Sequence, residues 1–140
     1  MLCREHAAQL RGRYDEITGR GAEVVAIGTG SVRHTAAFVA DENVPFPVLV
    51  DDDARAARAA SVRRVGFFRL LTDRRSREGA KRARAGGHRI HKAGRRVTQL
   101  GATLVIGPGD ELRYEHLDDH SADHAPLDEV LSALPAAAAD

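Results

Sequence analysis

The stretch EVVAIGTGSVRHTAAFVADENVPFPVLVDDD, residues 23–53, decides the fold of this chain. Its two short apolar runs, residues 23–28 and 47–50, are typical of strands that are covered on both faces. Between them, a polar cap at residues 29–31 precedes residues 32–41, which carry apolar side chains on a predicted helix. Strand, helix and strand at this spacing predict two parallel strands joined by a right-handed crossover.

The segments on either side of this unit have helical patterns. Residues 3–20 carry apolar or small side chains on one helical face, at Ala7, Leu10, Tyr14 and Ile17. On the other side, the acidic residues 51–53 precede residues 54–62, where carboxylates would meet the positive end of a helix dipole. The first 62 residues are therefore expected to form helix, strand, helix, strand and helix.

A second group of elements follows near the C-terminus. Residues 100–106 and 111–116 are extended runs on either side of a Pro-Gly-Asp turn, which predicts an antiparallel hairpin. A final helix is expected over residues 126–134, with one apolar stripe made by Leu127, Val130, Leu131 and Leu134. The chain thus ends in a hairpin and a helix.

The charge of the chain is concentrated between these two groups. Residues 63–96 contain 13 Lys and Arg against two acidic residues, while the rest of the chain contains 8 basic and 18 acidic residues. Residues 64–99, called the basic insert below, are too polar and too interrupted by glycine to fold alone, so we expect a mobile segment. Such a segment could contact an anionic surface, although nucleic acid is not the expected partner.

Length and cysteine content restrict the class of protein. A chain of 140 residues has the usual size of one domain, and its single cysteine excludes an internal disulfide. No signal-peptide pattern opens the chain, and no apolar run approaches the roughly 18 residues of a membrane span. We therefore expect a cytoplasmic protein in a reducing compartment, without membrane contact.

Four segments carry a resemblance that covers nearly the whole chain. They are CREHAAQL at residues 3–10, VAIGTG at residues 25–30, FPVLVD at residues 46–51 and GATLVIGP at residues 101–108. With the order of elements, they resemble the peroxiredoxin-like members of the AhpC/TSA group. The resemblance implies one α/β, thioredoxin-like domain over residues 1–140, with a βαβ unit and a C-terminal hairpin and helix, lacking the first core strand.

In that family the opening helix begins with a Cys-x-x-Cys motif, and the resemblance places Cys3 at its second cysteine. A thiol at a helix N-terminus meets unpaired N–H groups and a positive dipole, which favour the nucleophilic thiolate. The first cysteine would stand one residue before Met1, so we expect Met1 to be internal to a longer product. Without the preceding strand, two half-sheets would remain, and we expect the 140 residues to rearrange, to pair with another chain or to dissolve poorly.

Arg4 and His6 lie near Cys3 on the same predicted helix, where they would either favour the thiolate or be solvated. The resemblance marks two further positions. Ala102 occupies the position where thioredoxin-fold enzymes usually place a cis-proline, and Thr103 follows it. We expect a trans bond before Ala102, because a non-proline cis bond costs about 2.5–4 kcal/mol.

The implied function is thiol-dependent redox chemistry of the antioxidant, peroxiredoxin-like type, without a cofactor. The missing upstream cysteine would attack the oxidised substrate, and Cys3, the catalytic sulfur present in this chain, would resolve the resulting mixed disulfide or sulfenate. The implied partners are a peroxide or disulfide substrate, a thiol reductant and a second copy of the chain. With one cysteine, an intramolecular dithiol cycle would be incomplete. The alternative is a non-catalytic interaction domain that uses the basic insert to bind an anionic partner.

Two further motifs have a structural and a functional interpretation. His116, His120 and His124 are spaced by four among several aspartates, and on a helix they would form a metal-binding face. Because residues 118–125 lie between a strand and a helix that starts at a proline, we favour a polar loop and expect no metal site. The Gly-Thr-Gly at residues 28–30 is read as a turn and cap, because it lacks the third glycine of a dinucleotide-binding loop.

Overall fold

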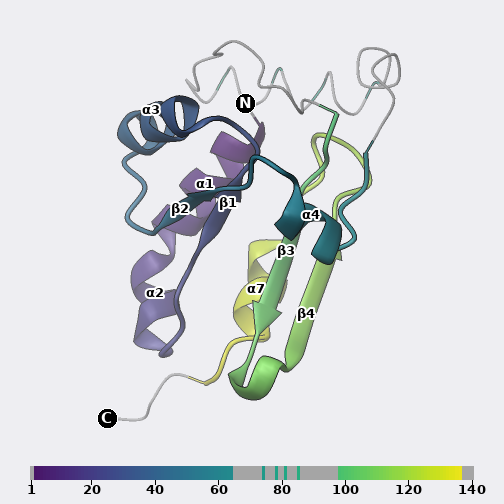
Figure 1. Ribbon diagram of the computed structural model, residues 1–140. Coiled ribbons are helices and arrows are strands. Elements are labelled where there is room, and N and C mark those ends of the chain that lie inside the picture. The colour runs from purple at the N-terminus through teal and green to yellow at the C-terminus, as the bar shows by residue number, and fades with distance from the viewer. Residues whose placement is uncertain are drawn as a thin grey trace.

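The computed structural model describes residues 2–64 and 98–136, together with the single positions 74, 78, 81 and 85; for Leu2 and Cys3 it describes the backbone alone (Figure 1). The elements in chain order are α1 (Leu2–Gly12), α2 (Tyr14–Gly19), β1 (Ala26–Gly28), α3 (Val32–Glu42), β2 (Val48–Val50), α4 (Arg55–Ala59), β3 (Ala102–Ile106), a 3₁₀ turn (Pro108–Asp110), β4 (Leu112–Leu117) and α7 (Leu127–Ser132). The order of strands and helices is the predicted one, except that the opening helix is divided in two.

The N-terminal half forms the predicted βαβ unit. Strands β1 and β2 pair in parallel, with Ala26 opposite Val48 and Gly28 opposite Val50, and α3 makes the crossover. The helix expected over residues 3–20 is instead two helices, because the chain leaves helical geometry at Arg13 (φ −120°, ψ 15°) directly after Gly12. Glycine is among the least favourable residues in a helix interior, which accounts for the break at this point.

The predicted acidic cap of α4 is present and comes from one residue. Asp51 Oδ1 accepts a hydrogen bond from the backbone N–H of Arg55 at 2.7 Å, and its Oδ2 accepts one from Ala57 at 3.2 Å. These N–H groups lack partners inside the helix, so the Asp51 carboxylate satisfies both of them and faces the positive end of the helix. The end of β2 thereby fixes the start of α4.

The C-terminal half is the predicted hairpin covered by a helix. Strands β3 and β4 pair antiparallel, from Ala102 opposite Leu117 to Ile106 opposite Leu112, with an irregularity after Val105. Figure 1 shows α7 on one face of this hairpin. The apolar core here consists of Val105, Ala125 and Val130, with Tyr114, Ala133 and Leu134 packed against it.

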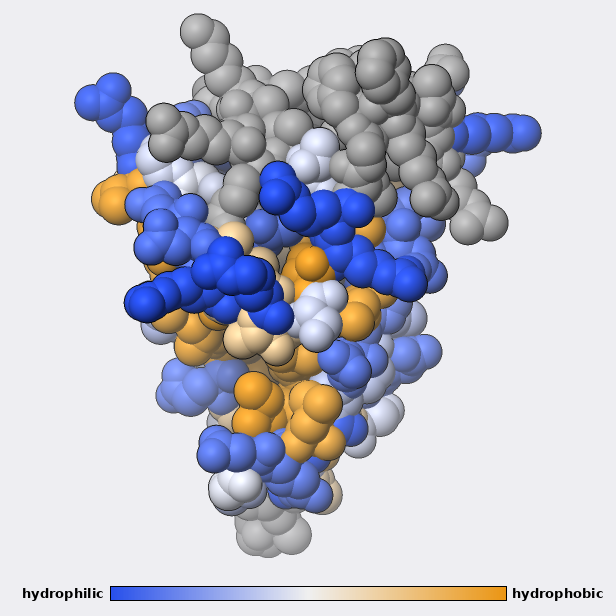
Figure 2. Space-filling view, turned by 45° about the vertical axis from the view of Figure 1, so that its right-hand side comes forward, coloured by the Kyte–Doolittle hydropathy of each residue, from blue (hydrophilic) through white to orange (hydrophobic). Residues whose placement is uncertain are grey.

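Within the described residues the four strands form two separate two-stranded sheets, β1–β2 and β3–β4. This agrees with the expectation of two half-sheets. Large apolar side chains are exposed on the strands and beside them: Val25, Ile27, Val32, Leu49, Leu104, Ile106 and Leu112. Figure 2 shows apolar residues gathered on one face of the molecule between hydrophilic ones. The exposed face is therefore a direct consequence of short, separate sheets.

The two ends of the basic insert meet. Arg64 and Gln99 form an isolated antiparallel bridge, and the backbone N–H of Leu100 donates to the Arg63 carbonyl oxygen at 2.9 Å. Most of the insert lies outside the described residues. Its predicted mobility and its predicted contact with an anionic partner therefore stay predictions. The structure therefore fixes only where the insert leaves and rejoins the domain.

Candidate functional site

Cys3 lies in the first turn of α1, an 11-residue helix. The first N–H groups of a helix have no intrahelical partner, and the helix dipole is positive at this end. This backbone position is the one that the sequence predicted for the thiol. Its role as the catalytic sulfur stays a prediction, because the described geometry of Cys3 is limited to the backbone.

Arg4, the next residue of α1, is buried and its charge is matched. Its Nη1 lies 2.9 Å from Glu42 Oε1 and 3.2 Å from Asp41 Oδ2, both at the end of α3. Its guanidinium carbon also lies 5.5 Å from the centre of the Phe38 ring. Arg4 thus joins α1 to α3, and its predicted influence on the Cys3 thiolate stays a prediction.

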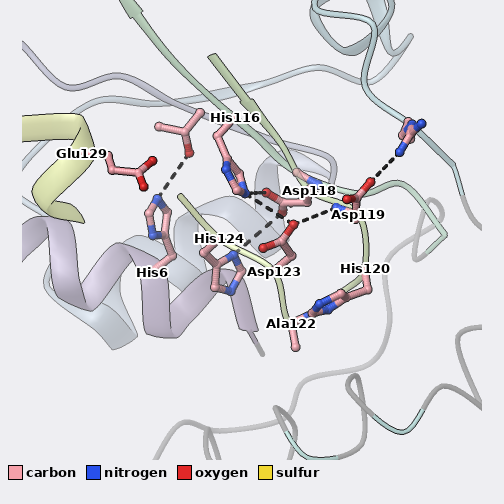
Figure 3. Close-up of polar contacts among 12 residues, drawn as sticks. His6, His116, Asp118, Asp119, His120, Ala122, Asp123, His124 and Glu129 are labelled. Carbon is pink, nitrogen blue, oxygen red and sulfur yellow. Dashed lines mark hydrogen bonds and ion pairs between the residues drawn. The ribbon is translucent and has the colours of Figure 1, made fainter. Parts of the chain in front are cut away.

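Ala102 and Thr103 open β3 and lie opposite α1. The Thr103 hydroxyl is 3.5 Å from Nε2 of His6, the residue one turn after Cys3. No cis peptide bond occurs among the described residues, so the bond before Ala102 is trans, as expected. The structure therefore brings two of the predicted supporting residues, His6 and Thr103, together across the interface between α1 and β3 (Figure 3).

His6 continues this contact toward the loop before α7. Its ring stacks on the ring of His124, with centroids 5.2 Å apart and planes inclined by 22°. Burial lowers the pKa of His6 below its ordinary value, and the neighbouring His124 lowers that pKa further. The His6 imidazole is therefore neutral near pH 7, when it can accept as well as donate a hydrogen bond.

Beyond His124 lies a group of imidazoles and carboxylates, called the His–Asp cluster below: His116, Asp118, Asp123 and His124 (Figure 3). His116 Nε2 is 3.4 Å from Asp123 Oδ2 and 3.7 Å from Asp118 Oδ1. His124 Nδ1 is 3.8 Å from the other Asp118 oxygen. Asp118 is 6% exposed, whereas His116 and Asp123 are half-buried, so the cluster is partly open to solvent.

Local backbone bonds build this cluster at the end of the hairpin. Directly after β4, Asp118 closes a double link to Gly101, in which each backbone N–H donates to an oxygen of the other residue at 3.1 Å. The chain then turns, and Asp123 Oδ2 accepts a hydrogen bond from the Asp119 N–H at 2.8 Å. That bond and the neighbouring His116 and His120 hold the pKa of Asp123 below its ordinary value, although burial acts in the opposite direction.

The polar loop predicted for residues 118–125 is confirmed, and the alternative, a helical face made by His116, His120 and His124, is not formed. His120 Nδ1 accepts a hydrogen bond from the Ala122 N–H at 3.2 Å and takes no part in the contacts among His116, Asp118 and Asp123. The cluster instead combines a strand residue, the residue after the strand and the far side of the turn. The sequence signal for this cluster was Asp118, which follows His116 by two residues at the end of a predicted strand.

A shallow open pocket lies beside the cluster. It has a volume of about 360 Å³ and lies between α1 and the start of α7. Its lining residues are Glu5, Gln9, Ala122, His124, Ala125, Pro126 and Leu127. His124 lines this pocket, and the His6 ring stacks on His124.

The order of elements and the cysteine in the first turn of α1 define a small α/β protein of the thioredoxin-like class. The sequence profile of the AhpC/TSA antioxidant enzymes matches residues 9–120, and this chain belongs to that family. The match begins after Cys3 and ends before Asp123, so it assigns no role to either residue. No curated protein and no solved structure matches the chain. No helix in the described ranges is long and apolar enough to cross a membrane.

Proposed function

We propose that this chain carries out thiol-dependent antioxidant chemistry, with Cys3 as the reactive sulfur. One observation carries the proposal: in a chain of the AhpC/TSA antioxidant family, the single cysteine stands in the first turn of a helix. The unpaired N–H groups and the dipole at that end favour the thiolate, which is the form that attacks peroxides and disulfides.

The proposed substrate is a peroxide, and the reductant is an external thiol. The Cys3 thiolate attacks one peroxide oxygen, so that an S–O bond forms, the O–O bond breaks and the leaving oxygen takes a proton as water or an alcohol. Cys3 is thereby oxidised to the sulfenic acid. A thiol condenses with it, releasing water and forming a mixed disulfide, and a second thiol then displaces Cys3 and leaves as the disulfide.

The positions of His6 and Thr103 support this chemistry. His6 is three residues after Cys3 on α1, and side chains at this spacing lie on the same side of a helix. A neutral imidazole held by Thr103 could accept the thiol proton. His6 and Thr103 are therefore proposed as positioning residues for the thiolate, while Arg4 serves the contact between α1 and α3.

The test is peroxide consumption by the 140-residue chain with glutathione or dithiothreitol as the reductant. We expect turnover above the rate of the reductant alone, loss of that turnover in Cys3→Ser, and trapping of the sulfenic acid of Cys3 by a dimedone reagent in mass spectra. His6→Gln is expected to slow the reaction and to shift the pH profile of Cys3 alkylation toward higher pH. The proposal is wrong if folded wild-type protein and Cys3→Ser consume peroxide equally, with Cys3 unmodified.

A further inference from the structure

The His–Asp cluster has the donor atoms of a metal site in close approach. One ligand atom from each of His116, Asp118 and Asp123 lies within 4.8 Å of the other two. The separation of His116 Nε2 from Asp123 Oδ2 is 3.4 Å and from Asp118 Oδ1 is 3.7 Å. Ligands about 2.1 Å from a tetrahedral zinc ion lie about 3.4 Å from one another, so small movements would place all three donors around one ion.

The charges of the cluster also lack a permanent cation. Asp118 is 6% exposed, and among the described residues its ion-pair neighbours are the imidazoles of His116 and His124. Asp123 faces His116 in the same way. The Asp118 and Asp123 side chains, 9% and 26% exposed, carry like charges close together and repel one another unless a positive charge lies between them. A divalent cation would supply that charge without protonation of either imidazole.

The imidazole nitrogen at the centre of the cluster, His116 Nε2, lacks a hydrogen bond within the described residues. His116 Nε2 is buried and makes no directed hydrogen bond within the described residues, although two carboxylate oxygens lie nearby. A buried polar atom without such a bond is unfavourable. A metal ion would engage this atom and the two facing oxygens at the same time.

We propose that the His–Asp cluster binds one divalent transition-metal ion through His116 Nε2 and one oxygen each of Asp118 and Asp123. An imidazole together with two carboxylates suits zinc and its neighbours, whereas magnesium and calcium prefer oxygen donors alone. His124 is assigned a positioning role, because its Nδ1 faces the second Asp118 oxygen at 3.8 Å. Water would complete the coordination.

Binding of the ion would connect three parts of the chain. His116 belongs to β4, Asp118 follows the strand, and Asp123 lies across the turn that leads to α7. One ion would connect these three parts and stabilise the folded state by an amount that rises with the logarithm of the ratio of free ion concentration to Kd. This inference is independent of the thiol chemistry proposed for Cys3, since none of the three ligands is part of that reaction.

The experiment measures zinc and cobalt binding to the full 140-residue chain. A background variant with Cys3→Ser, His88→Gln and His91→Gln removes the thiol and two imidazoles that could bind zinc elsewhere. In this background we expect one equivalent of Zn²⁺ by calorimetry, a rise in Tm on addition of Zn²⁺, and visible absorption bands when Co²⁺ replaces it. Calcium and magnesium are expected to leave Tm unchanged.

Single substitutions in the same background assign the ligands. His116→Gln, Asp118→Asn and Asp123→Asn are each expected to weaken zinc binding by at least about 10-fold and to abolish the cobalt bands. Two matched controls, His34→Gln and Asp15→Asn, change exposed residues on α3 and α2 and are expected to bind as the background does. Circular dichroism of the metal-free variants separates lost ligands from lost folding.

Three results would overturn the proposal. One is a background variant that is folded by circular dichroism and shows no zinc binding at millimolar concentration. Another is binding that persists in folded Asp123→Asn and His116→Gln proteins. The third is zinc binding by the wild type that disappears in the background variant, which would assign the ion to the removed thiol or imidazoles. A negative peroxide assay would leave the metal proposal standing, because the two tests use different residues.

Discussion

Two charged clusters lie beside α1, and they balance their charges in opposite ways. Arg4 places a permanent cation between Asp41 and Glu42, and its side chain and that of Glu42 are 10% and 8% exposed. The His–Asp cluster holds two carboxylates against imidazoles, which are charged only when protonated. In the first cluster a permanent cation faces the carboxylates, whereas in the second no Lys or Arg of the described residues forms an ion pair with Asp118 or Asp123.

The difference separates a structural role from a functional one. A buried ion pair with good geometry joins two helices, and it does so without a bound ligand. A group of carboxylates and imidazoles beside a surface pocket has the donor atoms to bind a cation. The same kinds of residue therefore point to different roles, depending on whether a permanent cation is present.

The strongest test of this contrast is Arg4→Met. The methionine keeps an apolar chain against Phe38 but leaves the buried Glu42 carboxylate without its cation, so we expect a loss of about 3–5 kcal/mol in the free energy of unfolding. Urea denaturation followed by circular dichroism measures the loss. The control is Arg13→Met, whose side chain is 43% exposed, with an expected change below about 1 kcal/mol. Equal effects of the two variants would mean that the Arg4 cluster is not a structural pair.

A smaller effect is expected from Gly101→Ala, which disturbs the other cluster. A methyl group here would lie 3.2 Å from Asp118 Cγ and closer still to its Oδ2. The buried carboxylate would have to move, so we expect a loss of about 1–3 kcal/mol together with weaker zinc binding. Gly12→Ala is the control, because nothing lies within 4 Å of its added carbon. Unchanged stability and unchanged zinc affinity in Gly101→Ala would argue against a fixed position for Asp118.

The pH dependence of stability distinguishes the clusters further. The pKa of His6 is lowered by burial and by His124, so the unfolded chain binds a proton at a higher pH than the folded chain does. In metal-free protein the stability is therefore expected to be complete above pH 6.5 and to fall as pH decreases from 6.5 toward the folded pKa. Asp118 and His116 also face His6, and His6→Phe removes the contribution of His6 alone.

The measurement is a series of urea unfolding curves between pH 5 and pH 8, with the His6 resonance followed by NMR. The wild type is expected to lose more stability than His6→Phe over the acidic part of this range. Parallel pH profiles for the two proteins, or a His6 resonance that titrates above pH 6.5, would contradict the assignment of a buried neutral imidazole.

Much of the fold could be predicted because its signals are local. The apolar runs that became β1 and β2, the Asp51 cap and the Pro-Gly-Asp turn each lie within a few residues of the structure that they specify. The break at Arg13 was missed, because the apolar spacing continues across it from α1 to α2. Periodicity records which face is buried, but it does not record where the backbone leaves the helix.

The candidate site was predicted less completely, for a physical reason. The sequence placed Cys3 and Thr103 through the family resemblance, but the contact of Thr103 with His6 spans 97 positions of the chain. The spacing of His116 and His124 suggested a helix face, whereas the strand end and a turn bring them to Asp118. Contacts made by a turn depend on backbone bonds that residue spacing alone does not determine.

The smallest expected effect comes from Glu16→Gln. This variant tests whether the stabilisation by the Arg4 ion pairs depends on their burial or only on their charges. Glu16 lies between Arg13 and Arg20, with ion-pair distances of 2.6 Å and 2.7 Å, so it repeats the arrangement of Arg4 with the signs reversed. Hydrogen bonding from Arg13 is the largest cause that lowers the pKa of Glu16. Its contribution to stability is therefore present at pH 7 and is lost as pH falls through the folded pKa.

Because Glu16 is exposed to solvent, we expect Glu16→Gln to lower Tm only slightly at low salt and pH 7. The difference from wild type should vanish near 1 M salt, where the screening length is about 3 Å, and it should shrink as pH falls through the folded pKa of Glu16. Differential scanning calorimetry measures both conditions. If Glu16→Gln lowered Tm as much as Arg4→Met does, and did so in high salt, the charges alone would account for both clusters. A small, salt-sensitive shift instead assigns the structural role of Arg4 to its burial between α1 and α3.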